Sequence, residues 1–177
     1  AQDQKYQKAT NFFIEAFTYD TGNYEAWFNL AEVSERNQSV DESLRLFEKA
    51  TTKYVNSPIE LAHIFEHISE SYLIKREYKN AVSAAEKAMV LDTLALEPYL
   101  LKAKALFNLH AYDSAQLSLT VYLDQINTNK LAWTLRGDCY FFLGRYSSAI
   151  SDYSSAIYLD DKLTEAINYR GQSYFYT

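Results

Sequence analysis

The chain has 177 residues, of which 48% are hydrophobic and 16% aromatic, with only four glycines and two prolines. This composition is too apolar for a disordered chain and too poor in helix-breaking residues for an all-β fold. The 17 basic and 23 acidic residues give a net charge of −6 without a basic stripe, so we expect no nucleic-acid partner. No apolar run approaches the roughly 18 residues that a membrane-spanning helix needs, so we expect no membrane span.

A short pattern recurs along the chain, in which an aromatic residue is followed three places later by alanine. The copies are Tyr6 with Ala9, Tyr78 with Ala81, Tyr112 with Ala115, and Tyr146 with Ala149. The last three copies are equally spaced, and a degenerate copy, Val40 with Ser43, lies between the first two. A fixed period of about 34 residues predicts a repeat array in which each unit is one supersecondary element.

The period divides the chain into repeat units. From the N-terminus we expect the second helix of a partial repeat, four full repeats, and the first helix of another partial repeat. These occupy residues 1–23, then 24–57, 62–95, 96–129 and 130–163, and finally 164–177, with residues 58–61 as an insert. We therefore predict a single repeat domain over residues 1–177. Its helix hairpins should be separated near residues 22–24, 56–61, 94–97, 128–131 and 161–164.

The segment 130–163 carries the clearest copy of the unit. Its marked positions are Trp133, Gly137, Tyr140, Ala149, Tyr153 and Ala156. The position of Trp133 is filled in the other units by Trp27, Phe65, Tyr99 and Ile167, and that of Gly137 by Ala31, Ser69, Ala103 and Gly171. On these residues the whole chain resembles the tetratricopeptide repeat family. The resemblance implies an all-α fold, a right-handed α-solenoid of antiparallel helix hairpins.

The ends of the units depart from the family pattern. The family often ends a unit with proline, whereas the corresponding residues here are Val55, Thr93, Asn127 and Asp161. The turns between units must therefore be made by other means. Both prolines of the chain, Pro58 and Pro98, are expected in the first turn of a helix, where the missing N–H has no intrahelical partner to lose.

In this family the first helix of each hairpin lines a concave groove that holds partner segments. The resemblance therefore implies a non-enzymatic scaffold that binds a protein or peptide partner, as an extended or helical segment, in this groove. The candidate groove residues are Glu25, Phe28, Glu32, Arg36, His63, Glu66, His67, Glu70, Leu100, Lys104, Phe107, Thr134, Asp138, Phe141, Asn168, Gln172 and Phe175. The earlier candidates are mainly acidic and would favour basic residues on the partner. The later ones are more apolar and aromatic and would take apolar anchors.

Three of the groove candidates, Phe107, Phe141 and Phe175, recur at the repeat period on first helices. We expect them to form an apolar track along the groove that a partner contacts. The alternative is that these rings are partly buried between helices.

The segment from His63 to His67 matches the His-x-x-Glu-His pattern of inverted zinc proteases. The two histidines are four residues apart on one helix face, so both could reach one zinc ion, and Glu66 could act on a bound water. The repeat register instead places these residues on an open face with no protease domain around them. We therefore interpret them as polar groove residues, and expect no catalytic residues, no metal and no cofactor.

Two other functions remain open. The aromatic residues of the groove could bind a glycan or another small molecule. Alternatively, the repeats could serve a larger enzyme or an assembly factor, since the chain starts and stops inside repeat units.

The apolar side chains of the two terminal helices lead to one more expectation. Phe12, Phe13, Ile14 and Phe17 crowd the first helix, and Ile167, Tyr169, Tyr174, Phe175 and Tyr176 crowd the last. Because repeat arrays normally end in polar faces, we expect end-to-end self-association.

The chain has a single cysteine, Cys139, which we expect to be a buried inert thiol. One cysteine does not indicate the cellular compartment, so the cytoplasm and secretion to the periplasm or outside both stay open.

Overall fold

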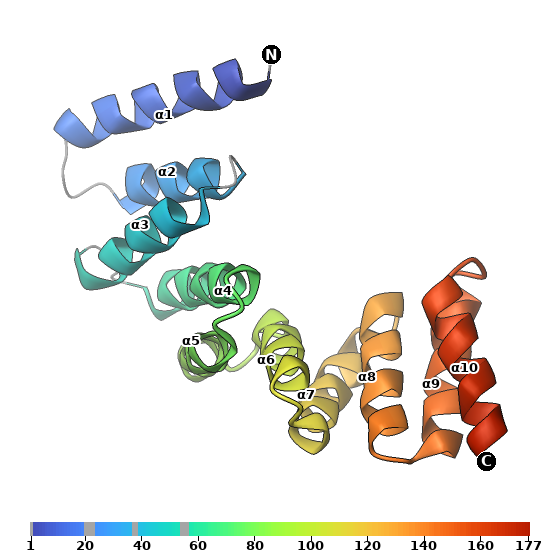
Figure 1. Cartoon of the computed structure of the whole chain (residues 1–177). Coiled ribbons are helices and arrows are strands. Elements are labelled where there is room, and N and C mark those ends of the chain that lie inside the picture. The colour runs from blue at the N-terminus through green and yellow to red at the C-terminus, as the bar shows by residue number, and fades with distance from the viewer. Residues whose placement is uncertain (1, 20–23, 37–38, 54–56) are drawn as a thin grey trace. The chain divides into compact units, whose positions relative to one another are not determined.

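The computed structural model describes residues 2–19, 24–36, 39–53 and 57–177. Within these ranges the regular structure is entirely helical, and they contain no strand. Helix pairs follow one another along the chain, which confirms the predicted all-α solenoid of helix hairpins (Figure 1). None of the helices in these ranges is long and apolar enough to cross a bilayer. The chain divides into two compact units, Ala1–Ala95 and Leu96–Thr177.

The first unit is built from helices that each pack against the next along the chain. Its core contains the buried side chains of Leu46, Phe47 and Ile64. The helices are α1 (Gln2–Tyr19), α2 (Tyr24–Arg36), α3 (Val40–Lys53), α4 (Pro58–Ile74) and α5 (Tyr78–Leu91).

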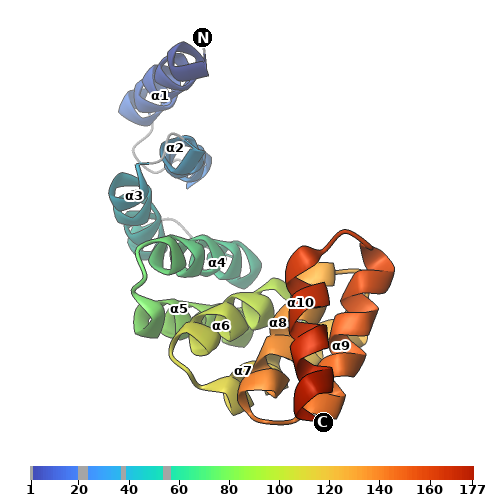
Figure 2. The ribbon, with the colours of Figure 1, turned by 45° about the vertical axis from the view of Figure 1, so that its right-hand side comes forward.

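The second unit continues the same pairing of consecutive helices. In addition, α8 contacts both α6 and α10, so the first helices of successive hairpins lie next to one another (Figures 1 and 2). This row of first helices forms the inner face of the unit. The helices are α6 (Glu97–Asn108), α7 (Tyr112–Gln125), α8 (Lys130–Phe142), α9 (Tyr146–Leu159) and α10 (Thr164–Tyr176).

Three of the turns inside hairpins share one backbone conformation. Arg76, His110 and Gly144 follow α4, α6 and α8 and have φ angles of 60°, 59° and 71°. After α8, the N–H of Arg145 donates to the carbonyl of Tyr140 at 2.8 Å, and the other two turns repeat this bond. This is the Schellman motif, which ends a helix with one residue in the left-handed region. The backbone conformation of these turns therefore repeats with the same period as the sequence.

The turns before helices are formed by several kinds of residue, because the prolines that often end a repeat unit in the family are not present at those positions. Pro58 and Pro98 lie in the first turns of α4 and α6, as predicted. The side chain of Asn129 caps α8 by accepting hydrogen bonds from two backbone N–H groups. Asp92 and Asp160 each accept a hydrogen bond from the backbone N–H two residues later, at 3.0 Å. Short polar side chains thus close the turns between hairpins.

The contact between α8 and α9 depends on one glycine. Ala149, Tyr153 and Ala156 of α9 are fully buried, and the ring of Tyr153 lies against Gly137. A Cβ atom at residue 137 would come within 2.7 Å of Cε1 of Tyr153. Glycine is therefore required on α8 for a buried tyrosine to fit between the two helices, and this ring positions the site described below.

Candidate functional site

A cavity of about 390 Å³ lies on the inner face of the second unit and is called the groove cavity below. Its walls come from α6, the turn before α8, α8 itself and the start of α10. Five of the predicted groove residues line it, namely Leu100, Lys104, Phe107, Thr134 and Asp138. The other lining residues, which the repeat pattern did not single out, are Asn108, Asn129, Leu131, Leu135 and Glu165.

Asp138 is the most deeply buried charged residue of the groove cavity, with 9% of its surface exposed. The hydroxyl of Tyr153 donates a hydrogen bond to its Oδ1 at 2.7 Å. Burial raises the pKa of Asp138 to about 6, the hydrogen bond from Tyr153 opposes this shift, and Glu165 adds to it. The carboxyl is therefore mostly ionised at neutral pH and takes up a proton in mildly acidic solution.

The remaining walls of the groove cavity are largely apolar. Leu100 is buried, Phe107 and Leu135 are half-buried, and Leu131 is exposed at the rim. Lys104 is half-buried on α6. Two acidic residues, Asp138 and Glu165, thus share one cavity with Lys104, two side-chain amides and one hydroxyl, beside aliphatic and aromatic walls. Small binding sites commonly combine apolar walls with a few polar groups in this way.

The predicted phenylalanine track is uneven. Phe107 is half-buried and packs edge-on against Tyr112 at 5.4 Å between ring centroids. Phe141 is half-buried among the rings of neighbouring residues on α8, α9 and α10. Phe175, by contrast, is 84% exposed. Phe107 and Phe141 are thus partly buried between helices, which is the alternative considered from the sequence. Phe175 is an exposed apolar ring. Of the two polar candidates on α10, Asn168 is exposed and Gln172 is half-buried.

The candidates of the first unit are spread over α2 and α4. Glu25 and Glu70 are exposed, whereas Phe28 and Glu32 are half-buried. The side chain of Arg36 lies outside the described residues. An acidic surface is therefore present on both helices, but none of the described cavities gathers these four residues.

The histidine motif on α4 is divided between surface and core. His63 is exposed, and its Nδ1 lies 3.2 Å from Oε2 of Glu66. The ring of His67 stacks on Phe47 at 4.9 Å and meets Phe28 edge-on at 5.3 Å. His67 is therefore half-buried rather than fully open to solvent, because these two rings cover part of it. Among the described residues, no group of three or more His, Cys, Asp or Glu side chains is placed to hold a metal ion.

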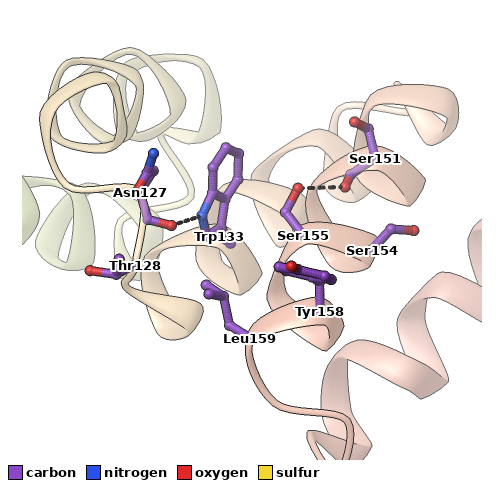
Figure 3. Close-up of a pocket in the computed structure, with 8 residues that line it drawn as sticks. All are labelled: Asn127, Thr128, Trp133, Ser151, Ser154, Ser155, Tyr158 and Leu159. Atoms are coloured by element: carbon purple, nitrogen blue, oxygen red, sulfur yellow. Dashed lines mark hydrogen bonds between the residues drawn. The ribbon is translucent and has the colours of Figure 1, made fainter.

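A second cavity, of about 700 Å³, lies between α9 and the turn before α8 and is called the outer cavity below (Figure 3). The indole N–H of Trp133 donates to the carbonyl of Asn127 at 2.8 Å, which fixes the ring at one wall. Tyr158 is 90% exposed and supplies a second aromatic ring. The lining residues are Asn127, Thr128, Trp133, Ser151, Ser154, Ser155, Tyr158 and Leu159. Sequence reasoning missed this cavity, because it considered only residues on first helices.

Sequence reasoning also missed a buried ion pair between α8 and α9. Arg136 donates to both carboxylate oxygens of Asp152, at 2.7 and 2.9 Å. Its guanidinium lies 4.8 Å from the ring of Trp133. Burial raises the pKa of Asp152, and the hydrogen bonds from Arg136 oppose this shift. The two residues lie on different helices, so no spacing within one helix could have indicated the pair.

Cys139 follows Asp138 on α8 and is fully buried, as expected from the sequence. Burial, together with the nearby Asp138 carboxylate, raises the pKa of the thiol to about 12. The thiol therefore stays protonated at neutral pH, where it behaves as a small apolar group.

Comparison with known sequences gives a partial family match. Residues 74–156 match the family described as anaphase-promoting complex, cyclosome, subunit 3. Over 169 residues the chain is 24% identical to anaphase-promoting complex subunit 3 of Schizosaccharomyces pombe. This alignment covers 93% of the chain but only 24% of the length of that relative.

Comparison with solved structures gives similarity over nearly the whole chain. A structure of MamA is similar with a TM-score of 0.81 at 15% identity, covering 92% of this chain and 93% of that one. YrrB, described as a TPR protein with an unusual peptide-binding site, is similar with a TM-score of 0.77 at 20% identity. That similarity covers 93% of this chain and 82% of YrrB.

The paired helices, the constant repeat period and the repeated Schellman turns define an α-solenoid built from helix hairpins. Together with the structural neighbours, they show the fold of tetratricopeptide repeat proteins, the family that the sequence resembles.

Proposed function

We propose that this protein is a non-enzymatic scaffold that holds a segment of a partner protein on the inner face of its second unit. The groove cavity is the main anchor for that segment. The observation that carries the proposal is the convergence of α6, α8 and α10 on one cavity with apolar walls and a buried carboxylate. Such cavities are typical places for an anchoring side chain of a bound segment.

Two similarities support this function. YrrB shares the fold and is described as having a peptide-binding site. The Schizosaccharomyces pombe relative is a subunit of a multi-subunit complex by its name, which agrees with a repeat array that serves a larger assembly. For the present chain, the proposal rests on the groove cavity itself.

The test uses two leucines of equal exposure in the second unit. Leu131 is 64% exposed at the rim of the groove cavity, and Leu117 is 63% exposed on α7, away from its lining. Dodecapeptides are selected from a displayed random library, and their affinities are measured for the wild type, Leu131→Arg and Leu117→Arg. We expect Leu131→Arg to weaken binding at least tenfold, because the larger side chain blocks the cavity.

Leu117→Arg serves as the control and should leave the affinity unchanged, since both substitutions add the same charge to an exposed site. Thermal melting should show that both variants are folded. Selected peptides that bind equally well to all three proteins would overturn the proposal, and so would the failure of the library to give any binder.

A second candidate function is the binding of a glycan or a similar polar small molecule. The outer cavity favours it, because the rings of Trp133 and Tyr158 and three serine hydroxyls share one lining. Aromatic rings stack on the apolar faces of sugars, and hydroxyls exchange hydrogen bonds with them. A glycan array would test this function, with Tyr158→Ala expected to abolish any signal. A signal that survives this substitution would exclude the outer cavity.

A further inference from the structure

Two buried aspartates on the α8–α9 hairpin have different partners. Asp152 is 3% exposed and is neutralised by the paired hydrogen bonds from Arg136. Asp138 is 9% exposed, and its hydrogen-bond donor in the described part of the chain is the neutral hydroxyl of Tyr153. A buried carboxylate is normally paired with a cation. Asp138 has the burial of such a carboxylate but lacks the cation.

The position of Asp138 allows a ligand to supply that cation. Tyr153 occupies Oδ1, so Oδ2 keeps its capacity to accept hydrogen bonds, and Asp138 belongs to the lining of the groove cavity. Glu165 brings a second carboxylate to the same cavity, against one amine from Lys104. Two negative charges and one positive charge favour a cationic group and disfavour an anionic one.

The walls of the groove cavity fit the rest of a basic side chain. Leu100, Phe107, Leu131 and Leu135 provide apolar surface beside the carboxylates. Arginine and lysine carry an aliphatic stem that packs on apolar surface and a charged end that needs acceptors. No other common side chain combines these two properties.

Building on the proposed function, we infer that the groove cavity is a subsite for one basic side chain, arginine or lysine, of the bound partner segment, with Asp138 as its main acceptor and Glu165 as a secondary one. In the bound state the basic side chain of the partner would pair with Asp138, as Arg136 pairs with Asp152. Lys104 limits the affinity by repulsion and favours partners whose other residues are not basic.

The subsite also makes binding depend on pH. A cation can pair only with ionised Asp138, whose pKa is about 6 in the free protein because of its burial. The other titratable groups around it are Lys104 on α6, Tyr153 on α9 and Glu165 on α10. Tyr153 stays neutral between pH 5 and 7.5, because burial raises the pKa of its hydroxyl above the usual value for tyrosine. Affinity should therefore fall as the pH drops below about 6.

The experiment compares pooled nonapeptides that differ only in the fixed central residue. One pool carries arginine, and a second carries citrulline, which has nearly the same shape but no charge. A third pool carries glutamate. Binding to the full chain is measured by fluorescence anisotropy at pH 7.5, and we expect the arginine pool to bind at least tenfold more tightly than the citrulline pool.

The variant Asp138→Asn should remove this preference, and Glu165→Gln should reduce it about threefold. Glu60→Gln is the control, because Glu60 is exposed on α4 in the first unit and is not among the predicted groove residues. Equal binding of the arginine and citrulline pools, an unchanged preference in Asp138→Asn, or tighter binding of the glutamate pool would each overturn the inference. If the pools bind equally and Leu131→Arg still blocks them, the proposed function stands without this subsite. If no pool binds, the proposed function also fails.

Discussion

The hairpins α4–α5 and α8–α9 have different side chains at equivalent positions of the contact between their two helices. One pair of equivalent positions is occupied by Ser69 and Ala85 in the first hairpin and by Gly137 and Tyr153 in the second, where the ring of Tyr153 lies against Gly137. All three side chains at these positions are fully buried, and Ser69 donates a hydrogen bond to the carbonyl of Ala81 at 2.9 Å. In the second hairpin the large ring of Tyr153 is matched by glycine on the other helix, whereas the first hairpin has two small residues at these positions. The repeat keeps these positions buried without keeping the individual residues.

The same two hairpins differ more strongly in polarity. Ile68 and Ala84 are buried in the first hairpin at the positions that Arg136 and Asp152 occupy in the second. Glu70 is exposed, whereas its counterpart Asp138 is buried and accepts the Tyr153 hydroxyl. The α8–α9 hairpin has thus exchanged apolar contacts for buried charges. A hairpin close to the family pattern can therefore carry a polar site, because the pattern does not specify these positions.

The largest expected effect comes from breaking the buried ion pair. Arg136→Met should destabilise the protein by about 3–5 kcal/mol, because it leaves the Asp152 carboxylate buried without a cation. The double variant Arg136→Ile with Asp152→Ala copies the α4–α5 hairpin and should recover most of this loss. Urea unfolding measures both variants. A single variant as stable as the double one would show that the pair is not effectively buried.

The second-largest expected effect concerns the pH dependence of stability, which buried Asp138 should contribute and its exposed counterpart Glu70 should not. Folding raises the pKa of Asp138 from 3.8 to about 6, so the folded state binds protons more readily than the unfolded state. Stability contributed by protonated Asp138 is therefore present below about pH 4 and is lost as the pH rises through about 6. A shift of about two pKa units corresponds to roughly 3 kcal/mol at neutral pH.

Asp138→Asn should therefore stabilise the protein by about 1–3 kcal/mol at pH 7.5 and remove this part of the pH dependence. Glu70→Gln should change neither quantity. Unfolding free energies measured at pH 4.5, 6 and 7.5 decide the outcome, and a loss of stability at pH 7.5 in Asp138→Asn would count against the buried ionised carboxylate.

A third prediction uses two glycines at the same repeat position. Gly137→Ala should destabilise the protein by about 1–3 kcal/mol, because the new Cβ would overlap the ring of Tyr153. At Gly171, one repeat later, a Cβ would meet nothing within 4 Å. Gly171→Ala should therefore stabilise α10 by about 0.5–1 kcal/mol through helix propensity. Thermal melting of the two variants should give shifts of opposite sign, and shifts of the same sign would refute the close fit between Gly137 and Tyr153.

The smallest expected effect concerns the repeated turn. Arg76 has a φ angle of 60°, whereas Gly144 fills the equivalent position of the α8–α9 hairpin. Arg76→Gly should stabilise the protein by up to about 1 kcal/mol, because glycine adopts this conformation without steric strain. Gly144→Ala should destabilise it by a similar amount. Denaturant midpoints measure both changes, and a neutral result for both would mean that the turn relaxes freely.

The fold could be predicted from the sequence because its main determinants are periodic. The spacing of aromatic and small residues indicated the helix pairs, and Trp133, Gly137 and Tyr153 were correctly assigned to packing. The left-handed turns at Arg76 and His110 carried a weaker signal, since only Gly144 among the three equivalent positions is a residue typical of that conformation.

The site was harder to predict because neighbouring helices decide its burial and charge. Asp138 occupies a position that the register places on the groove, yet the hydroxyl of Tyr153 from the next helix reaches it. The burial of His67 was also set by neighbouring helices, because rings from α2 and α3 cover part of a side chain that α4 alone would leave in solvent. Glu165 enters the groove cavity from another repeat, and nothing in its own repeat position marked it. These contacts depend on side-chain reach between helices, which a single-sequence period does not contain.

The proposed role of Asp138 is to accept a cation of the partner in the groove cavity. Carboxyl carbon NMR of the aspartate-labelled protein, with Asp138→Asn used to assign the signal, measures its pKa directly. We predict a pKa of about 6 in the free protein and a lower value in the presence of Nα-acetyl-argininamide, with no change in the presence of its citrulline counterpart. A pKa near that of an exposed aspartate, or one that neither compound alters, would contradict the account.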